Sequence, residues 1–180
     1  MNVDALFALL TEAKKLCKHS EYVVVGSLSV LGMSDVTAIP GDMTMSIDAD
    51  CYTLRDPGRV LDLQAELGEG SPFHQQHGIY LDPVNPKLPT LPDGWETRLI
   101  KVGRGGVVAH FLEPHDAAVS KLARGEERDF RWVLAGAKGN ILALPTVAIR
   151  MKSTGFLDDA EKQAALALLD KAMAALQAGK

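Results

Sequence analysis

One stretch near the start of the chain limits the possible folds more than any other. An apolar run, Tyr22–Val25, stops at Gly26-Ser27, and a short apolar segment follows over residues 28–33. A polar segment rich in turn formers, over 34–42, then leads to a second run of alternating character over 43–52. Because Val and Tyr favour strands while Gly and Ser interrupt them, this order predicts strand, Gly-Ser turn, short helix, loop and strand.

Two aspartates stand two residues apart in the second strand-like run. Residues i and i+2 of a strand point to the same face, so Asp48 and Asp50 present two carboxylates side by side, while Ile47, Ala49 and Cys51 face apolar packing. Asp is disfavoured in strands, and adjacent carboxylates repel. A divalent cation with oxygen ligands, most often Mg²⁺ held together with substrate phosphates, would compensate this repulsion. The pattern predicts a metal site, and a solvated polar face on an edge strand is the alternative.

The Gly26-Ser27 pair permits two interpretations. In the first it is a strand-to-helix turn, where Gly allows unusual φ values and Ser caps the helix that follows. In the second it binds phosphate, because Gly lets the backbone approach the ligand while the Ser hydroxyl and helix N-terminal N–H groups donate to it. The two aspartates downstream favour the second interpretation.

Val25-Gly26-Ser27 followed by Ile47-Asp48-Ala49-Asp50 resembles the signature of the nucleotidyltransferase fold. That superfamily includes DNA polymerase beta, the minimal nucleotidyltransferases and the AbiEii-type toxins. The resemblance implies that Asp48 and Asp50 are catalytic and bind Mg²⁺ (or Mn²⁺), and that Gly26 and Ser27 bind the nucleotide. The gap from Ser27 to Asp48 is longer here than in the minimal nucleotidyltransferases.

The same resemblance implies a third carboxylate from the next strand of the sheet. Residues 78–82 read as a short strand that ends in an acid, so Asp82 is the candidate for a third catalytic residue. The alternative is a turn-forming Asp in front of Pro83.

A second segment, residues 113–133, is similar to AbiEii-type proteins and to a group of uncharacterised bacterial nucleotidyltransferase-like proteins. It has a Lys on one predicted helix, followed by Arg124 and then Arg128-Asp129. Lys121 and Arg124 are three residues apart, so they can share a helix face. The resemblance implies that Lys121, Arg124 and Arg128 bind the nucleotide. An ordinary charged helix-turn-helix with surface ion pairs is the alternative.

The rest of the chain completes an α/β (α+β) fold, in which a small mixed sheet is flanked by helices. Hydrophobic periodicity and turn signals predict helices over 4–18, 57–67 and 114–125, another helix from 126 and a final one from about 158, with strands over 97–102 and 107–112. His74 and His77 read as polar loop residues, because no further metal ligands accompany them. Residues 83–94 are rich in proline and predict an irregular loop, a candidate lid over the site. We expect one compact unit, a nucleotidyltransferase-like core over 1–112 with a helical region over 113–180 packed on it.

Charge and composition limit the cellular context and the partners. The net charge is −4, which argues against a surface built for nonspecific nucleic-acid binding. The two cysteines stand in unlike patterns and predict reduced thiols, and we see no leader and no long apolar run, so we expect a cytoplasmic protein that does not insert into a membrane.

The sequence thus predicts a metal-dependent enzyme that transfers a nucleoside monophosphate from a nucleoside triphosphate to an acceptor hydroxyl. The acceptor is left open between RNA, protein and a small molecule, and the resemblance to AbiEii-type proteins raises a toxin–antitoxin role. An Ala-rich final helix makes a homo-oligomer or a cognate antitoxin-like partner the expected contacts. The alternative function is a catalytically degenerate nucleotide-binding or protein-interaction module.

Overall fold

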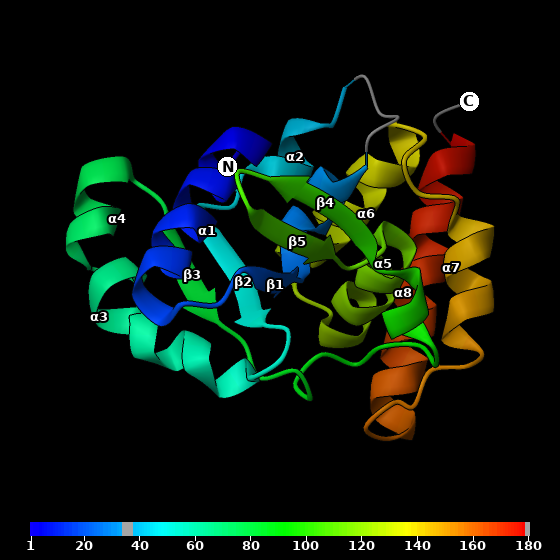
Figure 1. Cartoon of the computed structure of the whole chain (residues 1–180). Coiled ribbons are helices and arrows are strands. Elements are labelled where there is room, and N and C mark those ends of the chain that lie inside the picture. Colours follow the sequence, from blue (N-terminus) through cyan, green and yellow to red (C-terminus); the bar gives the residue numbers. More distant parts are fainter. Residues whose placement is uncertain (34–37, 179–180) are drawn as a thin grey trace.

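The computed structural model describes residues 1–33 and 38–178, and within them the strands form one five-stranded sheet of order β3-β2-β1-β5-β4 (Figure 1). The strands are β1 (Glu21–Val24), β2 (Asp48–Thr53), β3 (Tyr80–Pro83), β4 (Ile100–Arg104) and β5 (Val107–Phe111). β1 pairs antiparallel with β2 and parallel with β5, β2 pairs parallel with β3, and β4 and β5 form an antiparallel hairpin. The mixed sheet confirms the predicted fold class.

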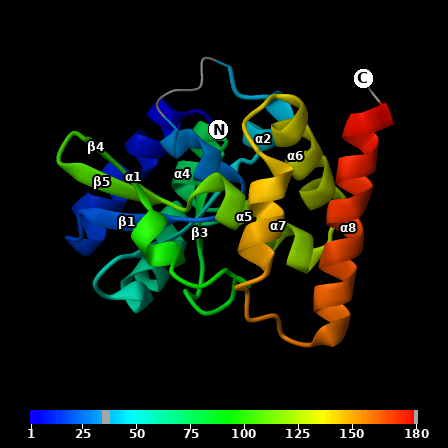
Figure 2. The same ribbon diagram turned by 90° about the vertical axis from the view of Figure 1, so that its right-hand side faces the viewer.

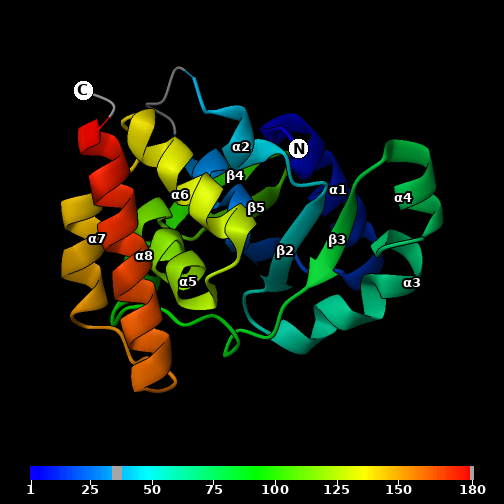
Figure 3. The ribbon, with the colours of Figure 1, turned by 180° about the vertical axis from the view of Figure 1, so that it is seen from behind.

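Helices lie on two sides of this sheet. Figures 1 and 3 show α1 (Val3–Cys17), α3 (Gln64–Leu67) and α4 (Pro72–His77) on one side of the molecule. The other side carries α5 (Pro114–Arg124), α6 (Glu127–Lys138), α7 (Leu144–Met151) and α8 (Asp159–Ala178), and Figure 2 shows α7 and α8 at its outer edge. The remaining helices are short: η1 (Gly26–Gly32), α2 (Gly41–Thr44), η2 (Pro57–Leu63) and η3 (Trp95–Arg98).

Helix α1 lies within one residue of its predicted bounds, because its buried residues recur at helical spacing. Asn2 caps α1 by accepting a hydrogen bond from the backbone N–H of Ala5. Leu6, Leu9, Leu10 and Ala13 recur at helical spacing and are completely buried. Among the described residues, no helix has both the length and the apolar character needed to cross a membrane.

The predicted strand over 43–52 is wrong in its first half. Residues 41–44 form the short helix α2, and β2 begins only at Asp48. The side chain of Met43 is completely buried, and its carbonyl accepts a hydrogen bond from the indole N–H of Trp132 on α6. Tertiary packing therefore overrides the alternating pattern here. Of the predicted loop over 34–42, residues 34–37 lie outside the described part of the chain.

Two other boundaries differ from the sequence prediction. His74 and His77 lie in α4 rather than in a loop, because Ser71 caps that helix and Gly78 ends it with a positive φ of 69°. The predicted strand over 97–102 begins only at Ile100. Arg98 precedes it in η3, where its side chain donates two hydrogen bonds to the buried carboxylate of Asp116 on α5. The proline-rich segment is irregular over 84–94, as predicted, apart from an isolated bridge between Pro92 and Thr154, while Pro83 is the last residue of β3.

Candidate active site

The Gly-Ser turn lies directly against the second aspartate of the Asp-x-Asp pair. β1 and β2 run antiparallel, and the N–H of Val25 donates to the carbonyl of Asp50 over 2.9 Å. The next residue, Gly26, takes a φ of +66°, which turns the chain into η1. This left-handed conformation is open to Gly and costly for residues with a Cβ.

Three carboxylates converge at the edge of β2 and β3. In the parallel register of these strands, Asp48 pairs with Tyr80 and Asp50 pairs with Asp82. One oxygen from each of Asp48, Asp50 and Asp82 lies within 4.8 Å of the other two. The hydroxyl of Ser46 also donates a hydrogen bond to Asp48. The structure therefore brings together all three predicted carboxylates.

The electrostatics of this cluster leave negative charge in excess. Burial, together with the charges of Asp48 and Asp82, raises the pKa of Asp50 to about 7, even though Lys121 and Arg124 oppose the shift. Burial and the charges of Asp48 and Glu69 also raise the pKa of Asp82. Three hard oxygen donors with uncompensated charge form the ligand set that Mg²⁺ and Mn²⁺ favour. The cluster is therefore compatible with metal binding.

A group of ions on α5 and α6, in which Lys121 and Asp129 are buried and Arg124 is about half exposed, connects the Gly-Ser turn to the helices. The Lys121 ammonium donates to the hydroxyl of Ser27 and to Asp129, each over 3.0 Å. Arg124 donates to both carboxylate oxygens of Asp129, over 2.7 and 2.6 Å. Burial opposes the ionised form of Asp129, but the hydrogen bonds from Arg124 and the charge of Lys121 hold its pKa below the usual range. Asp129 thereby fixes the positions of both cations.

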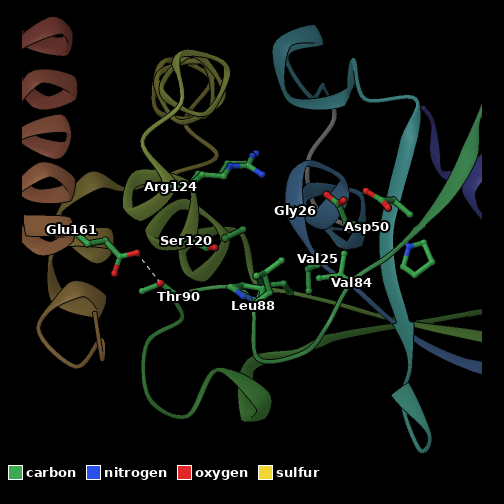
Figure 4. A pocket seen from close by; sticks show the side chains of 15 residues that line it. Val25, Gly26, Asp50, Val84, Leu88, Thr90, Ser120, Arg124 and Glu161 are labelled. Atoms are coloured by element: carbon green, nitrogen blue, oxygen red, sulfur yellow. Dashed lines mark hydrogen bonds between the residues drawn. The ribbon is translucent and has the colours of Figure 1, made fainter. Parts of the chain in front are cut away.

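Both cations keep donors that these contacts do not use. An ammonium has three N–H groups, and Lys121 uses two of them. Arg124 uses its Nε and Nη2, and Figure 4 shows its guanidinium extending toward Gly26 and Asp50. These donors can bind phosphate oxygens, because both residues line the cavity described next.

A cavity of about 450 Å³ opens beside the carboxylates (Figure 4). Gly26, Asp50 and Asp82 line it at the sheet, while Lys121 and Arg124 line it from α5. The further lining residues are Val25, Pro83, Val84, Leu88, Pro89, Thr90, Leu112, Ala117, Ser120 and Glu161. This volume falls in the range of small-molecule sites. The proline-rich segment thus borders the site, where the sequence predicted a lid.

Two of the predicted nucleotide-binding residues, Ser27 and Arg128, do not line the cavity. Ser27 stays connected to it through Lys121, whereas Arg128 lies apart. Its side chain is 65% exposed and donates to Glu126 over 2.6 Å. It is separate from the cavity lining, so its predicted contact with nucleotide gains no support from the geometry.

Four residues that support or line the site were not predicted from the sequence, namely Trp132, Ser120, Thr90 and Glu161. The indole N–H of Trp132 donates to the carbonyls of Ser27 and Met43, both over 3.1 Å, and so holds the Gly-Ser turn from behind. Ser120, Thr90 and Glu161 also line the cavity. Ser120 stands four residues before Arg124, a helical spacing that predicts a shared face, whereas no local pattern marks Trp132, Thr90 or Glu161.

Comparison with known proteins gives one match. A family model described as "Nucleotidyltransferase of unknown function (DUF6036)" matches residues 4–174. This range includes both predicted motifs, the three aspartates and the cavity lining. No curated protein and no solved structure matches the chain.

Proposed function

Since this chain belongs to the DUF6036 family of nucleotidyltransferases, we propose that it transfers a nucleoside monophosphate from a nucleoside triphosphate to an acceptor hydroxyl. One observation carries the proposal: three carboxylates from β2 and β3 converge beside a Gly-Ser turn, and Lys121 and Arg124 line the same cavity as two of them, Asp50 and Asp82. This arrangement provides negative charge for a metal ion and positive charge for phosphates in the same place.

Asp48, Asp50 and Asp82 are the residues that would hold a divalent ion, Mg²⁺ or Mn²⁺. When bound, such an ion neutralises charge on the phosphates and polarises the reacting phosphorus. The raised pKa values of Asp50 and Asp82 support this assignment, because burial and the neighbouring carboxylates disfavour their charged forms and a cation would relieve this.

The residues of the chain have separate roles in the proposed reaction. The acceptor oxygen forms a bond to the α-phosphorus while the bond from that phosphorus to the bridging oxygen breaks, and pyrophosphate leaves with the bond electrons. Asp82, the exposed member of the three carboxylates, accepts the proton of the acceptor hydroxyl. Lys121 and Arg124 donate to the β- and γ-phosphates as charge develops on the leaving group. Gly26 lets the backbone of the turn approach the same phosphates.

The alternative function is a module that binds nucleotide or a partner protein without catalysis. Its support is the same site, because metal and phosphate binding need the same groups as catalysis.

The resemblance to AbiEii-type proteins extends the proposal to a toxin-type role with a cognate antitoxin-like partner. Expression of the wild type and of Asp48→Asn in cells tests that extension: growth arrest by the wild type alone supports it, and equal growth contradicts it.

The activity is tested with purified protein, Mg²⁺ and each of the four α-labelled nucleoside triphosphates, with a cell lysate as the pool of acceptors. Asp48→Asn and Asp50→Asn remove one carboxylate charge each at nearly constant shape. Asp62→Asn is the matched control, because Asp62 is 60% exposed and pairs with Arg59 on η2. Label transferred by wild type and control but not by the site variants supports the enzyme, and the labelled species identifies the acceptor class. Metal-dependent nucleotide binding without any transfer favours the alternative.

A further inference from the structure

The cavity beside the carboxylates continues toward α8, and there its lining changes in character. Apolar side chains line the cavity between the carboxylates and α8: Figure 4 shows Val84 close to Asp50 and Leu88 farther toward Thr90, and Pro89, Leu112 and Ala117 also belong to the lining. The polar groups beside them are Ser120, Thr90 and Glu161 (Figure 4). We propose that this part of the cavity binds the base of the nucleotide and that Glu161 selects guanine. The inference rests on the proposed function, which places the phosphates at the other end.

Helix α5 gives the cavity a direction. Ala117, Ser120, Lys121 and Arg124 all line it, and their i, i+3, i+4 and i+7 spacing puts them on one face of the helix. They follow each other as an apolar residue, a hydroxyl and two cations over roughly 10 Å of helix axis. A nucleoside triphosphate has the same order of chemistry, from a flat base through a sugar to the phosphates. The gradient along α5 therefore orients the base toward the first turn of α8, which carries Glu161.

The proline-rich segment over 83–94 forms the wall opposite α5, and it is held in place at both ends. The segment follows Asp82 directly and is thus continuous with β3. At its far end, the hydroxyl of Thr90 donates to Glu161 over 3.1 Å, and the N–H of Asp93 donates to the carbonyl of Ser153 over 2.8 Å. A fixed apolar wall suits a flat, rigid aromatic ring, because little side-chain or loop entropy is lost on binding.

Glu161 presents acceptors that are only partly used. Its Oε1 accepts from Thr90, and its Oε2 accepts from the backbone N–H of Leu157 over 2.6 Å. A carboxylate has about four acceptor positions, so both oxygens can accept again. Within residues 1–33 and 38–178, neither Lys, Arg nor His forms a salt bridge with it. The carboxylate is therefore available to N–H donors of a ligand.

Such a pair of acceptors distinguishes the four bases. Guanine offers two neighbouring donors, the ring N1–H and the 2-amino group, which match both oxygens of a carboxylate. Adenine and cytosine place their amino group next to a ring nitrogen that is itself an acceptor and would repel the second oxygen. Uracil has one N–H between two carbonyls, which repel the carboxylate on both sides. A site built to accept from two donors rejects a base that lacks them.

The test is calorimetric binding of the α,β-methylene analogues of GTP, ATP, CTP and UTP with Mg²⁺, because these analogues cannot transfer their nucleotide. We expect the guanine analogue to bind about tenfold more tightly than the uracil analogue, in line with roughly 1–3 kcal/mol for a bidentate contact. The hypoxanthine analogue lacks only the 2-amino group and should fall between them. In Glu161→Gln the preference for guanine over uracil should shrink to about twofold, while the affinity for uracil stays unchanged.

Glu66→Gln, an exposed site on α3, is the control and should keep the preference of the wild type. Equal affinity for all four analogues, or an equal loss for all four in Glu161→Gln, overturns the assignment of Glu161 and leaves the proposed function intact. Absence of binding for every analogue in the presence of Mg²⁺ overturns the proposed function, and this inference fails with it.

Discussion

The carboxylate of Asp50 occupies the space in which residue 26 would carry a side chain. A Cβ on Gly26 would lie 3.0 Å from the Cγ of Asp50 and closer still to its Oδ2. The Gly-Ser turn and the Asp-x-Asp strand, 22 residues apart at Gly26 and Asp48 in the sequence, are therefore two halves of one packing arrangement. Gly26 is therefore required for two reasons: its positive φ allows the turn, and its missing side chain leaves room for the carboxylate of Asp50.

Gly26→Ala should destabilise the protein and weaken metal binding. A Cβ at a φ of +66° costs about 1–2 kcal/mol in backbone strain alone, and the contact with Asp50 adds to it. We expect the melting temperature to fall by roughly 2–4 °C for each kcal/mol. Calorimetric melting checks this, with Gly41→Ala as the control, because a Cβ on Gly41 meets nothing within 4 Å. Equal melting temperatures for the two variants would contradict the packing argument.

Asp50→Asn should stabilise the metal-free protein at pH 8 while removing its response to metal. Asp50 is ionised at this pH against its buried, acidic surroundings, and the amide relieves that repulsion. We expect a gain of roughly 1 kcal/mol, or about 2–4 °C. Thermal melting with and without Mg²⁺ or Mn²⁺ measures both effects. A variant less stable than the metal-free wild type would show that Asp50 is held by attraction instead.

The metal-free protein should lose stability as pH rises. The pKa of Asp50 is raised to about 7 from an ordinary value near 3.8, so the folded protein binds more protons than the unfolded chain between these values. Stability from this group is therefore complete below about pH 4 and declines as pH rises through about 7. Urea unfolding from pH 5 to 8 with chelator measures the slope. Asp50→Asn should lack this part of the slope, and an unchanged slope would contradict the assignment.

Metal affinity should have the opposite pH dependence. A proton on Asp50 competes with the ion, so binding of Mn²⁺ should weaken below about pH 7, by up to roughly tenfold per pH unit. Titration of Mn²⁺ followed by electron paramagnetic resonance measures the free ion directly. An affinity that is constant from pH 5.5 to 8 would place the metal elsewhere.

The sequence predicts the parts of this site that depend on local periodicity, and the structure brings these residues together. Asp48 and Asp50 share a face because strands repeat every two residues, and Lys121 and Arg124 share one because helices repeat at three to four. Asp82 needed a further assumption, the pairing of β2 with β3, which the resemblance supplied.

Other parts depend on packing between distant segments, which no local pattern encodes. Met43 is drawn into a short helix by burial and by Trp132, 89 residues away. Arg128 and Asp129 are neighbours on α6, and one residue along a helix rotates the side chain by about 100°. Asp129 therefore pairs with Lys121, whereas Arg128 faces Glu126 outside the cavity. Glu161 reaches the site only because α8 packs on α5.

Asp129→Asn should be far more damaging than the loss of an exposed pair. Asp129 is completely buried and pairs with both the buried Lys121 and the half-exposed Arg124. Arg124 has a further contact with Glu126, so neutralising Asp129 leaves the buried Lys121 ammonium without a paired carboxylate. We expect a loss of roughly 3–5 kcal/mol in the free energy of unfolding, the range for breaking a buried pair. Glu126→Gln, which removes an exposed partner of Arg128, should cost less than about 1 kcal/mol. Urea unfolding compares them, and similar losses would mean that the buried ions contribute little.

The measurement that tests the central claim most directly compares two labels on the same nucleotide. Wild type, Asp50→Asn and the Asp62→Asn control are incubated with Mg²⁺, a lysate and a nucleoside triphosphate labelled at either the α- or the γ-phosphate. We predict acceptor labelling from the α-position only, with labelled pyrophosphate released from the γ-position, in the wild type and the control but not in Asp50→Asn. Acceptor labelling from the γ-position, or α-labelling that persists in Asp50→Asn, would contradict nucleotidyl transfer at this site.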